Sequence, residues 1–145
     1  MAERNTMKVR IYSPQGTIYE HRAYGCNVKS IDGGVTLLPN HAPILVALDL
    51  GAVKVTRCED GNPIDYIAIN GGVLEMRDNV CEIITNFAIR ARDIDEAHVL
   101  TEKQMAEQEM QSAIASDDTI AFKRAKIALD RAVNMISVSK HRRIR

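Results

Sequence analysis

The segment Phe87–Ala97, with the sequence FAIRARDIDEA, marks the point at which this chain of 145 residues changes character. Before it, short apolar runs are separated by glycine, proline, Asp-Gly and Asp-Asn signals, whereas no glycine or proline occurs after it. Because both residue types mark turns and interrupt helices, the two parts need different secondary structure. We therefore predict two units, a strand-rich unit at 1–90 and a helical unit at 91–145.

The first unit alternates apolar and polar residues with the period of two that is typical of half-buried strands. In MKVRIYS (7–13), Met7, Val9 and Ile11 fall on one face. Further runs follow between turn signals: TIYEHRAYG, IDGGVTLLP, ILVALD, GAVKVTR, IDYIAIN, GVLEMR and NVCEIIT. Many short strands at this spacing predict an antiparallel β-sandwich or a barrel.

The second unit has the pattern of two helices. Asp93, followed three positions later by Glu96, is typical of a capping box and predicts a first helix that runs to about Ala115. Ser116-Asp117-Asp118 predicts a break and a new N-cap, and a second helix then runs to about Ser139. Alanine recurs at three- and four-residue steps, which lets two helix axes approach closely. We expect an antiparallel α-helical hairpin that is marginally stable alone.

The two predicted helices carry opposite charge. Residues 92–118 contain two basic and eight acidic residues, a net charge of −6, whereas residues 119–145 contain eight basic residues and one acidic residue, a net charge of +7. One interpretation is a solvated helix face with a frayed terminus. The other is a basic helix that binds an acidic protein surface.

Composition excludes several classes of protein. Apolar residues make up 46% and charged residues 26%, as in soluble globular proteins, and the 19 basic residues balance the 19 acidic ones. This balance and the low aromatic content predict no nucleic-acid partner. No apolar run reaches the roughly 18 residues of a membrane span, and we expect no direct membrane insertion and no secretory signal. Three scattered cysteines predict free thiols in a reducing compartment.

No arrangement of side chains points to catalysis. The four histidines are isolated, and the spacings that hold a metal, a phosphate or an activated nucleophile are absent from the sequence. His41, in LLPNHAPIL (37–45), has no nearby residue to orient it as a general base. We predict that the protein is not an enzyme and has no metal or cofactor. Two other classes stay open: a free-standing β-sandwich binding module with a helical oligomerisation hairpin, and a hydrolase whose groups converge only in the fold.

Four segments together resemble the epsilon subunit of the F-type rotary ATP synthase. They are LLPNHAPILVALDLGAV (37–53), AINGGVLE (68–75), FAIRARDIDEA (87–97) and FKRAKIALDRA (122–132), and they stand in the family's order. The resemblance spans residues 7–138. It implies a non-catalytic central-stalk (rotor) subunit that couples ion flow through the c-ring to rotation and ATP synthesis. It also implies a peripheral position on the cytoplasmic face of the inner (plasma) membrane.

The resemblance implies two contact surfaces. The β-sandwich would dock on the gamma subunit and the c-ring, and the residues expected there are Asp32, His41 and Pro43, although His41 could also serve only its turn. Many relatives carry a glutamate where this chain has Gly34, so an ion pair with the c-ring would have to come from Asp32.

The helical hairpin would be the regulatory part. It can fold down on the sandwich or extend along gamma towards the alpha/beta hexamer, where its second helix would meet an acidic segment of the beta subunit and block ATP hydrolysis. The cations expected at this inhibitory contact are Lys123, Arg124, Lys126 and Arg131.

A nucleotide site of some relatives is present only as a remnant. Those relatives bind ATP in the hairpin through an Ile/Leu-Asp-x-x-Arg-Ala box and further arginines. Here the box reads IDEAHV (94–99), with His98 in the arginine position. Asp95 and Arg131 remain, and Asp95 has a local explanation in the first helical turn. Because several charge-assisted contacts are lost, we expect at most weak affinity for ATP.

Overall fold

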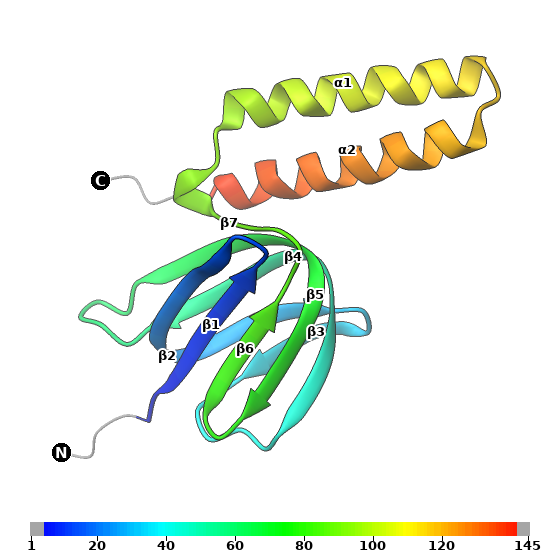
Figure 1. Ribbon diagram of the computed structural model, residues 1–145. Helices are drawn as coiled ribbons and strands as arrows, with labels where there is room; N and C mark the ends of the chain where they lie inside the picture. The colour runs from blue at the N-terminus through cyan, green and yellow to red at the C-terminus, as the bar shows by residue number, and fades with distance from the viewer. Residues whose placement is uncertain (1–4, 142–145) are drawn as a thin grey trace. The chain divides into compact units, whose positions relative to one another are not determined.

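The computed structural model describes residues 5–141, and the chain divides after Arg90 into two compact units (Figure 1). In the described part, the first unit contains β1 (Met7–Ser13), β2 (Gly16–Ser30), β3 (Gly33–Leu37), β4 (Ile44–Arg57), β5 (Ile64–Arg77), β6 (Val80–Ile84) and β7 (Ala88–Arg90). The second unit contains the 3-10 helix η1 (Ala91–Asp93) and the helices α1 (Glu96–Ala115) and α2 (Thr119–Ser139). The predicted fold class, a β-sandwich followed by a helical hairpin, is confirmed.

Five strands of the first unit pair into a closed ring. The order around the ring is β1, β6, β5, β4 and β2, and β2 pairs with β1 again. Strand β3 joins through β2, and β7 joins through β5. A ring with an odd number of strands cannot alternate direction throughout, so one pair must be parallel. That pair is β1–β6, which differs from the all-antiparallel sheet expected from the sequence.

Two of the predicted turns lie inside long strands instead. The runs at 44–49 and 51–57 form the single strand β4, and the runs at 64–70 and 72–77 form β5. The Gly-Gly signal in β5 is a bend and not a chain reversal, because Gly71 and Gly72 adopt φ angles of 92° and 146° while β5 keeps its register with β4. Glycine inside a strand often marks such a bend or a close backbone approach. The prediction of turns at these positions was therefore wrong.

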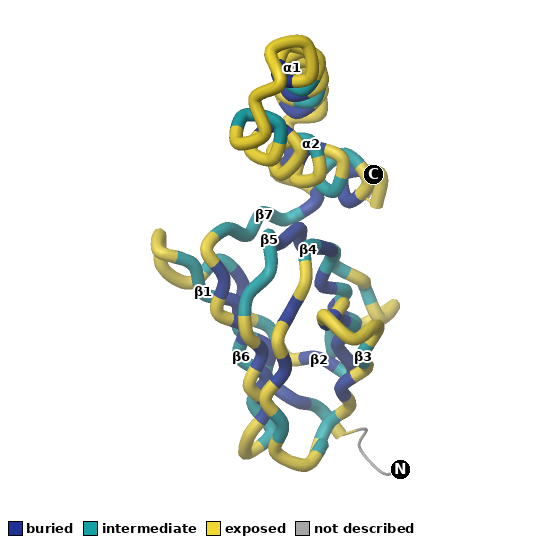
Figure 2. Tube along the Cα trace, turned by 90° about the vertical axis from the view of Figure 1, so that its right-hand side faces the viewer, coloured by how far each residue is buried: buried dark blue, intermediate teal, exposed yellow. Residues whose placement is uncertain are grey.

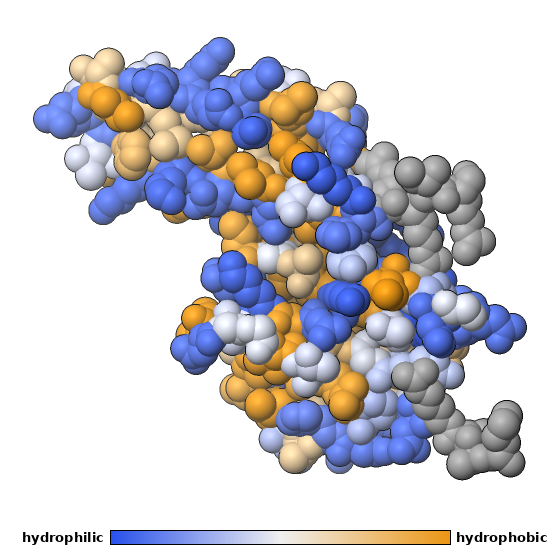
Figure 3. All heavy atoms as spheres, turned by 180° about the vertical axis from the view of Figure 1, so that it is seen from behind, coloured by the Kyte–Doolittle hydropathy of each residue, from blue (hydrophilic) through white to orange (hydrophobic). Residues whose placement is uncertain are grey.

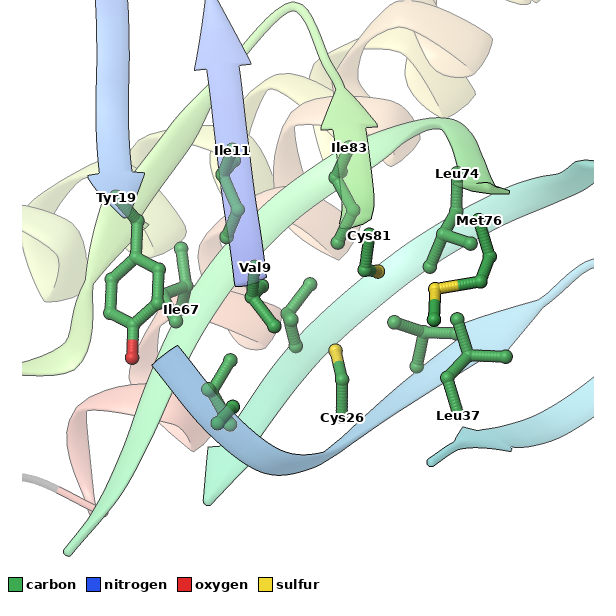
Figure 4. Packing of buried hydrophobic residues seen from close by; sticks show 14 of the residues in the cluster. Val9, Ile11, Tyr19, Cys26, Leu37, Ile67, Leu74, Met76, Cys81 and Ile83 are labelled. Carbon is green, nitrogen blue, oxygen red and sulfur yellow. The ribbon is translucent and has the colours of Figure 1, made fainter. Parts of the chain in front are cut away.

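The core lies inside the ring (Figure 4). As the alternation predicted, Met7, Val9 and Ile11 are fully buried. Cys26 and Cys81 are buried free thiols, and a hydrogen bond between them together with burial raises the pKa of Cys26 well above its usual value. Cys26 thus stays protonated, and both buried cysteines behave as small core residues. The other fully buried side chains include Leu37, Val53, Val55, Ile67, Leu74, Met76 and Ile83.

The helices end where the sequence indicates, but the first N-cap is two residues later than predicted. Asp93 closes η1, and Asp95 is the N-cap of α1, where its carboxylate accepts the His98 N–H at 3.2 Å. In the same way Asp118 caps α2 by accepting the Ala121 N–H at 3.0 Å. Each cap satisfies one of the N–H groups that a helix start leaves without an intrahelical partner.

The two helices meet along a narrow seam of small side chains. Ala106 and Ala113 of α1 and Ala125 and Ala132 of α2 are buried, each pair seven residues apart, and most other positions are exposed (Figure 2). At the open end of the hairpin, the Ser139 hydroxyl donates to Glu96 Oε1 at 2.7 Å. The ion pairs of the described helical residues all join residues i and i+4 of one helix. Among the described residues, the opposite net charges of α1 and α2 therefore do not form ion pairs between the two helices.

The bend of β5 generates a stability prediction. A Cβ atom at Gly72 would lie 2.3 Å from the Ile84 carbonyl oxygen, and its φ of 146° suits only glycine. We expect Gly72→Ala to lower the free energy of unfolding by roughly 2–4 kcal/mol. Gly34→Ala is the control, because a Cβ there meets nothing within 4 Å. Denaturant titration of both variants tests this, and equal stability of the two would contradict the close approach of β5 and β6.

Candidate functional site

The loop between β3 and β4 holds two of the predicted site residues, His41 and Pro43. The His41 N–H donates to the Leu38 carbonyl at 3.1 Å, and ring Nδ1 lies 2.7 Å from the Ala42 carbonyl oxygen. This contact fits a proton on Nδ1. His41 is half-buried and Pro43 is exposed. The backbone N–H of His41 thus closes the turn, and one ring nitrogen contacts the Ala42 carbonyl. Pro43 of the same loop is exposed to solvent.

The third residue of this predicted surface, Asp32, lies at a different turn. It is exposed between β2 and β3, where its N–H donates to Ser30 Oγ at 3.1 Å. The neighbouring Ile31 N–H donates to the Ala47 carbonyl at 3.1 Å, which fixes this turn beside the first part of β4. The structure therefore joins His41 and Pro43 in the β3–β4 loop and places Asp32 at the separate β2–β3 turn of the same unit.

An exposed apolar surface lies on the outer side of β4, β5 and β6. Ala47 pairs with Val73, and Val73 pairs with Ile84, so the three form one row across the strands. Leu45 is 70% exposed, Ile31 65%, Ile84 61% and Val73 42%. We call Ile31, Leu45, Ala47, Val73 and Ile84 the outer apolar patch. Hydrophobic side chains gather on the strand unit in the space-filling view (Figure 3). Contiguous exposed apolar surface of this kind marks interaction sites.

Sequence reasoning missed the outer apolar patch, although a signal for it exists. ILVAL (44–48) and CEII (81–84) contain neighbouring apolar residues where a half-exposed strand should alternate. Every second residue of such a run must point outward, because successive side chains lie on opposite faces. An apolar run in a sheet with one solvated face therefore predicts an apolar outer surface.

A second cluster surrounds the carboxylate of Asp65. The Tyr19 hydroxyl donates to Asp65 Oδ2 at 2.6 Å, and Arg57 Nε and Arg90 Nη2 lie 3.5 and 3.8 Å from the same oxygen. The Arg90 guanidinium also stacks over the Tyr19 ring, 5.2 Å from its centre. Burial and the hydrogen bond to Asp65 raise the pKa of Tyr19, so its phenol stays protonated. Because Asp65 is engaged by these donors, we interpret it as a structural carboxylate that fixes β7.

The four predicted cations of α2 are all exposed. Lys126 pairs with Asp130, Nζ to Oδ2 3.3 Å. Within residues 5–141, no ion pair is formed by Lys123, Arg124 or Arg131. Three of the eight basic residues at 119–145 lie in 142–145, outside the described residues.

Two isoleucines extend the cationic face of α2. Ile120 is 71% exposed and Ile127 is 53% exposed. With Arg124 and Arg131 they follow steps of three and four residues, which places all four on one side of the helix. We call Ile120, Arg124, Ile127 and Arg131 the α2 stripe. It offers both charge and apolar area to a partner.

The two residues that remain of the predicted nucleotide site, Asp95 and Arg131, lie in different parts of the hairpin. The Asp95 carboxylate caps α1. Arg131 lies eight residues before Ser139, which contacts Glu96 at the start of α1. Eight residues correspond to roughly 12 Å along a helix axis, so Arg131 faces a different part of the hairpin.

The described residues contain neither a metal-ligand cluster nor a candidate membrane-spanning helix. No group of three or more His, Cys, Asp or Glu side chains is arranged to hold a metal ion there. No helix within residues 5–141 is both long and apolar enough to cross a membrane.

Comparison with known proteins identifies both units. Residues 6–91 match the family model described as ATP synthase, Delta/Epsilon chain, beta-sandwich domain. Residues 92–140 match the one described as ATP synthase, Delta/Epsilon chain, long alpha-helix domain.

Two solved structures are similar to the chain. One is a chain in the cryo-EM structure of the Euglena gracilis mitochondrial ATP synthase (OSCP/F1/c-ring, rotational state 1), with a TM-score of 0.77, 19% identity and coverage of 94% of this chain and 83% of that chain. The other belongs to the Tetrahymena thermophila mitochondrial ATP synthase (central stalk/c-ring), with a TM-score of 0.51, 18% identity and coverage of 63% and 72%. At these identities the likenesses show the fold.

The surroundings of His21 generate a pH prediction. Its ring lies 4.8 Å from the Tyr19 ring, and burial, with Arg57 as the next cause, lowers the pKa of His21 below its usual 6.5, although Asp65 and Glu59 act in the opposite direction. The unfolded chain therefore binds this proton more readily, so the free energy of unfolding should fall as the pH drops below about 6.5.

Denaturant titration at pH 8 and pH 5.5 measures this effect. We expect His21→Gln to lose less stability than the wild type between the two pH values. Thr17→Ser, at an exposed position of β2 in the same unit, is the control, because it removes no titratable group and should keep the wild-type dependence. An unchanged pH dependence in His21→Gln would refute the assignment.

Proposed function

We propose, from the premise that the chain belongs to the ATP synthase delta/epsilon family, that it is a non-catalytic central-stalk (rotor) subunit of an F-type ATP synthase. The observation that carries this proposal is the match of two family models in sequence order over residues 6–140. The fold shared with chains from an F1/c-ring assembly and from a central stalk supports it. In this role the chain would couple ion flow through the c-ring to rotation and ATP synthesis.

The strand unit would dock on gamma and the c-ring. The outer apolar patch supplies the apolar area that a stable protein contact needs, and its side chains are set by three paired strands. Asp32 follows Ile31 of the patch directly, and His41 and Pro43 precede Leu45. We therefore propose that the patch contacts gamma and that the two neighbouring turns face the polar loops of the c-ring. The chain would then be held at the membrane by the c-ring, in a peripheral position.

The proposed gamma contact is tested with a double variant of the patch. Leu45→Ser with Ile84→Ser should weaken gamma binding at least about tenfold, because both side chains are more than half exposed and their loss leaves the core intact. Ile64→Ser, at an exposed apolar position outside the patch, is the control. Pull-down and calorimetry with purified gamma measure the affinity.

Two outcomes would contradict this assignment. Wild-type affinity of the double variant would exclude the patch as the contact. If the wild-type chain ignored gamma and formed oligomers through its hairpin, a free-standing binding module would be the better function.

The helical unit would restrain ATP hydrolysis. Its seam of alanines buries little area, so the pairing of α1 with α2 contributes little free energy, and a partner could redistribute the helices between states that differ by a few kcal/mol. The α2 stripe, with Lys123, offers cations that form no ion pair within the described residues. We propose that α2, when extended, binds an acidic segment of the beta subunit through these cations and Lys126. Opposite charge steers such an encounter and fixes its register.

This contact predicts a charge-dependent loss of inhibition. In an assembled complex, Arg124→Glu with Arg131→Glu should raise ATP hydrolysis, with the half-inhibitory concentration of the chain increasing about tenfold, because two attractive contacts become repulsive. Deletion of residues 119–145 sets the upper limit of activity. Gln108→Glu with Gln111→Glu adds negative charge to α1 as the control. Unchanged hydrolysis in the α2 variant and in the deletion would exclude α2 as an inhibitor.

We propose no nucleotide-binding role for Asp95 and Arg131. The Asp95 carboxylate is engaged in capping α1, and Arg131 lies in the α2 stripe about two helical turns away along the hairpin. Regulation of the hairpin would then depend on contacts with other subunits.

A further inference from the structure

The turn between β5 and β6 is a two-residue hairpin connection made by Asp78 and Asn79. Both residues have positive φ angles, 52° and 62°, and the strands pair directly on either side, Arg77 with Val80. This is the geometry of a type I′ turn, in which glycine is the favoured second residue. Asparagine tolerates the left-handed conformation but offers the turn itself no advantage over glycine. The Asn79 side chain therefore calls for a separate explanation.

The Asn79 amide bridges two segments far away in the sequence. Its Oδ1 accepts the Asn40 N–H at 2.8 Å, and its Nδ2 donates to the Thr6 carbonyl at 2.7 Å. Its own carbonyl accepts the Lys8 N–H at 3.2 Å. One partner is a donor and the other an acceptor, so only one orientation of the amide satisfies both. The side chain thus joins the β3–β4 loop, the β5–β6 turn and the segment that leads into β1.

The partner Asn40 is the residue before His41. Asn40 has a φ of 66°, which an L-residue other than glycine rarely adopts, and its N–H is held by Asn79. The His41 N–H then returns to Leu38 and closes the turn. The bond from Asn79 is therefore placed to fix the conformation from which His41 and Pro43 are presented.

We infer that Asn79 is a positioning residue for the β3–β4 loop, and that through Asn40 it sets the surface carrying His41 and Pro43 that meets the rotor partners. The second half of this inference rests on the proposed function, whereas the first half concerns the free chain alone. A purely local role in the turn gives the opposite expectation, because glycine would then be as good at position 79 or better.

The test compares three substitutions in one turn. Asn79→Gly keeps a favourable type I′ turn and removes both side-chain bridges. Asn79→Asp keeps an acceptor for the Asn40 N–H and removes the donor to Thr6. Asp78→Gly is the matched control, since it introduces glycine into the same turn and leaves both bridges in place.

Two measurements on the full chain report the result. The first is the heteronuclear ¹⁵N–¹H NOE, with amide exchange against water, for residues 40–42. We expect Asn79→Gly to lower the NOE and to speed exchange of the Asn40 amide about fivefold to tenfold, while Asp78→Gly and Asn79→Asp stay close to wild type. The second is affinity for purified gamma and for the c-ring, which should fall in Asn79→Gly alone.

The outcomes separate this inference from the proposed function. A wild-type NOE and wild-type exchange at residues 40–42 in Asn79→Gly would overturn the positioning role. Equal loosening in Asp78→Gly would also overturn it, because the turn rather than the amide would then be responsible. If the loop loosens while neither gamma nor the c-ring binds the wild-type chain, the positioning role stands and the proposed function fails.

Discussion

Closure of the five-strand ring is the constraint on which the first unit depends. An odd ring needs one parallel pair, and the chain meets this need by placing β1 beside β6, strands that are distant in sequence. Closure also requires a sharp bend in β5, where Gly72 brings the backbone against Ile84. Once the ring is closed, the register decides which side chains point outward, and this fixes the outer apolar patch.

The second unit is built on a different balance of forces. Alanine removes much less apolar area from water than leucine or isoleucine, so a seam of alanines contributes little stabilisation per residue. Its helices are nevertheless well capped, by Asp95 and Asp118, and locked at the open end by Ser139 and Glu96. The hairpin is thus locally well defined by its caps, although its seam contributes little stabilisation.

The sequence was sufficient where a local pattern controls the structure. The bounds of β1 and the last residues of both helices follow from alternation, break signals and caps. The first cap was misplaced because Asp93 and Asp95 both fit an N-cap, and the choice is made by the η1 turn, in which the Ile94 N–H returns to the Ala91 carbonyl. The glycines of β5 read as a turn because the close approach to β6 that requires them is a tertiary contact. For the same reason no pattern could show that Asn79 contacts Thr6 and Asn40, since these contacts span 73 and 39 residues.

The distribution of the three cysteines has a practical consequence. Cys26 and Cys81 are enclosed in the ring, whereas Cys58 is half-buried in the segment after β4. A thiol-specific reagent applied to the native chain should therefore modify Cys58 alone. The thiols of Cys26 and Cys81 should become reactive only when the ring opens. Counting modified thiols by mass would report opening of the ring directly, and a dye could be attached at Cys58 without any engineered cysteine.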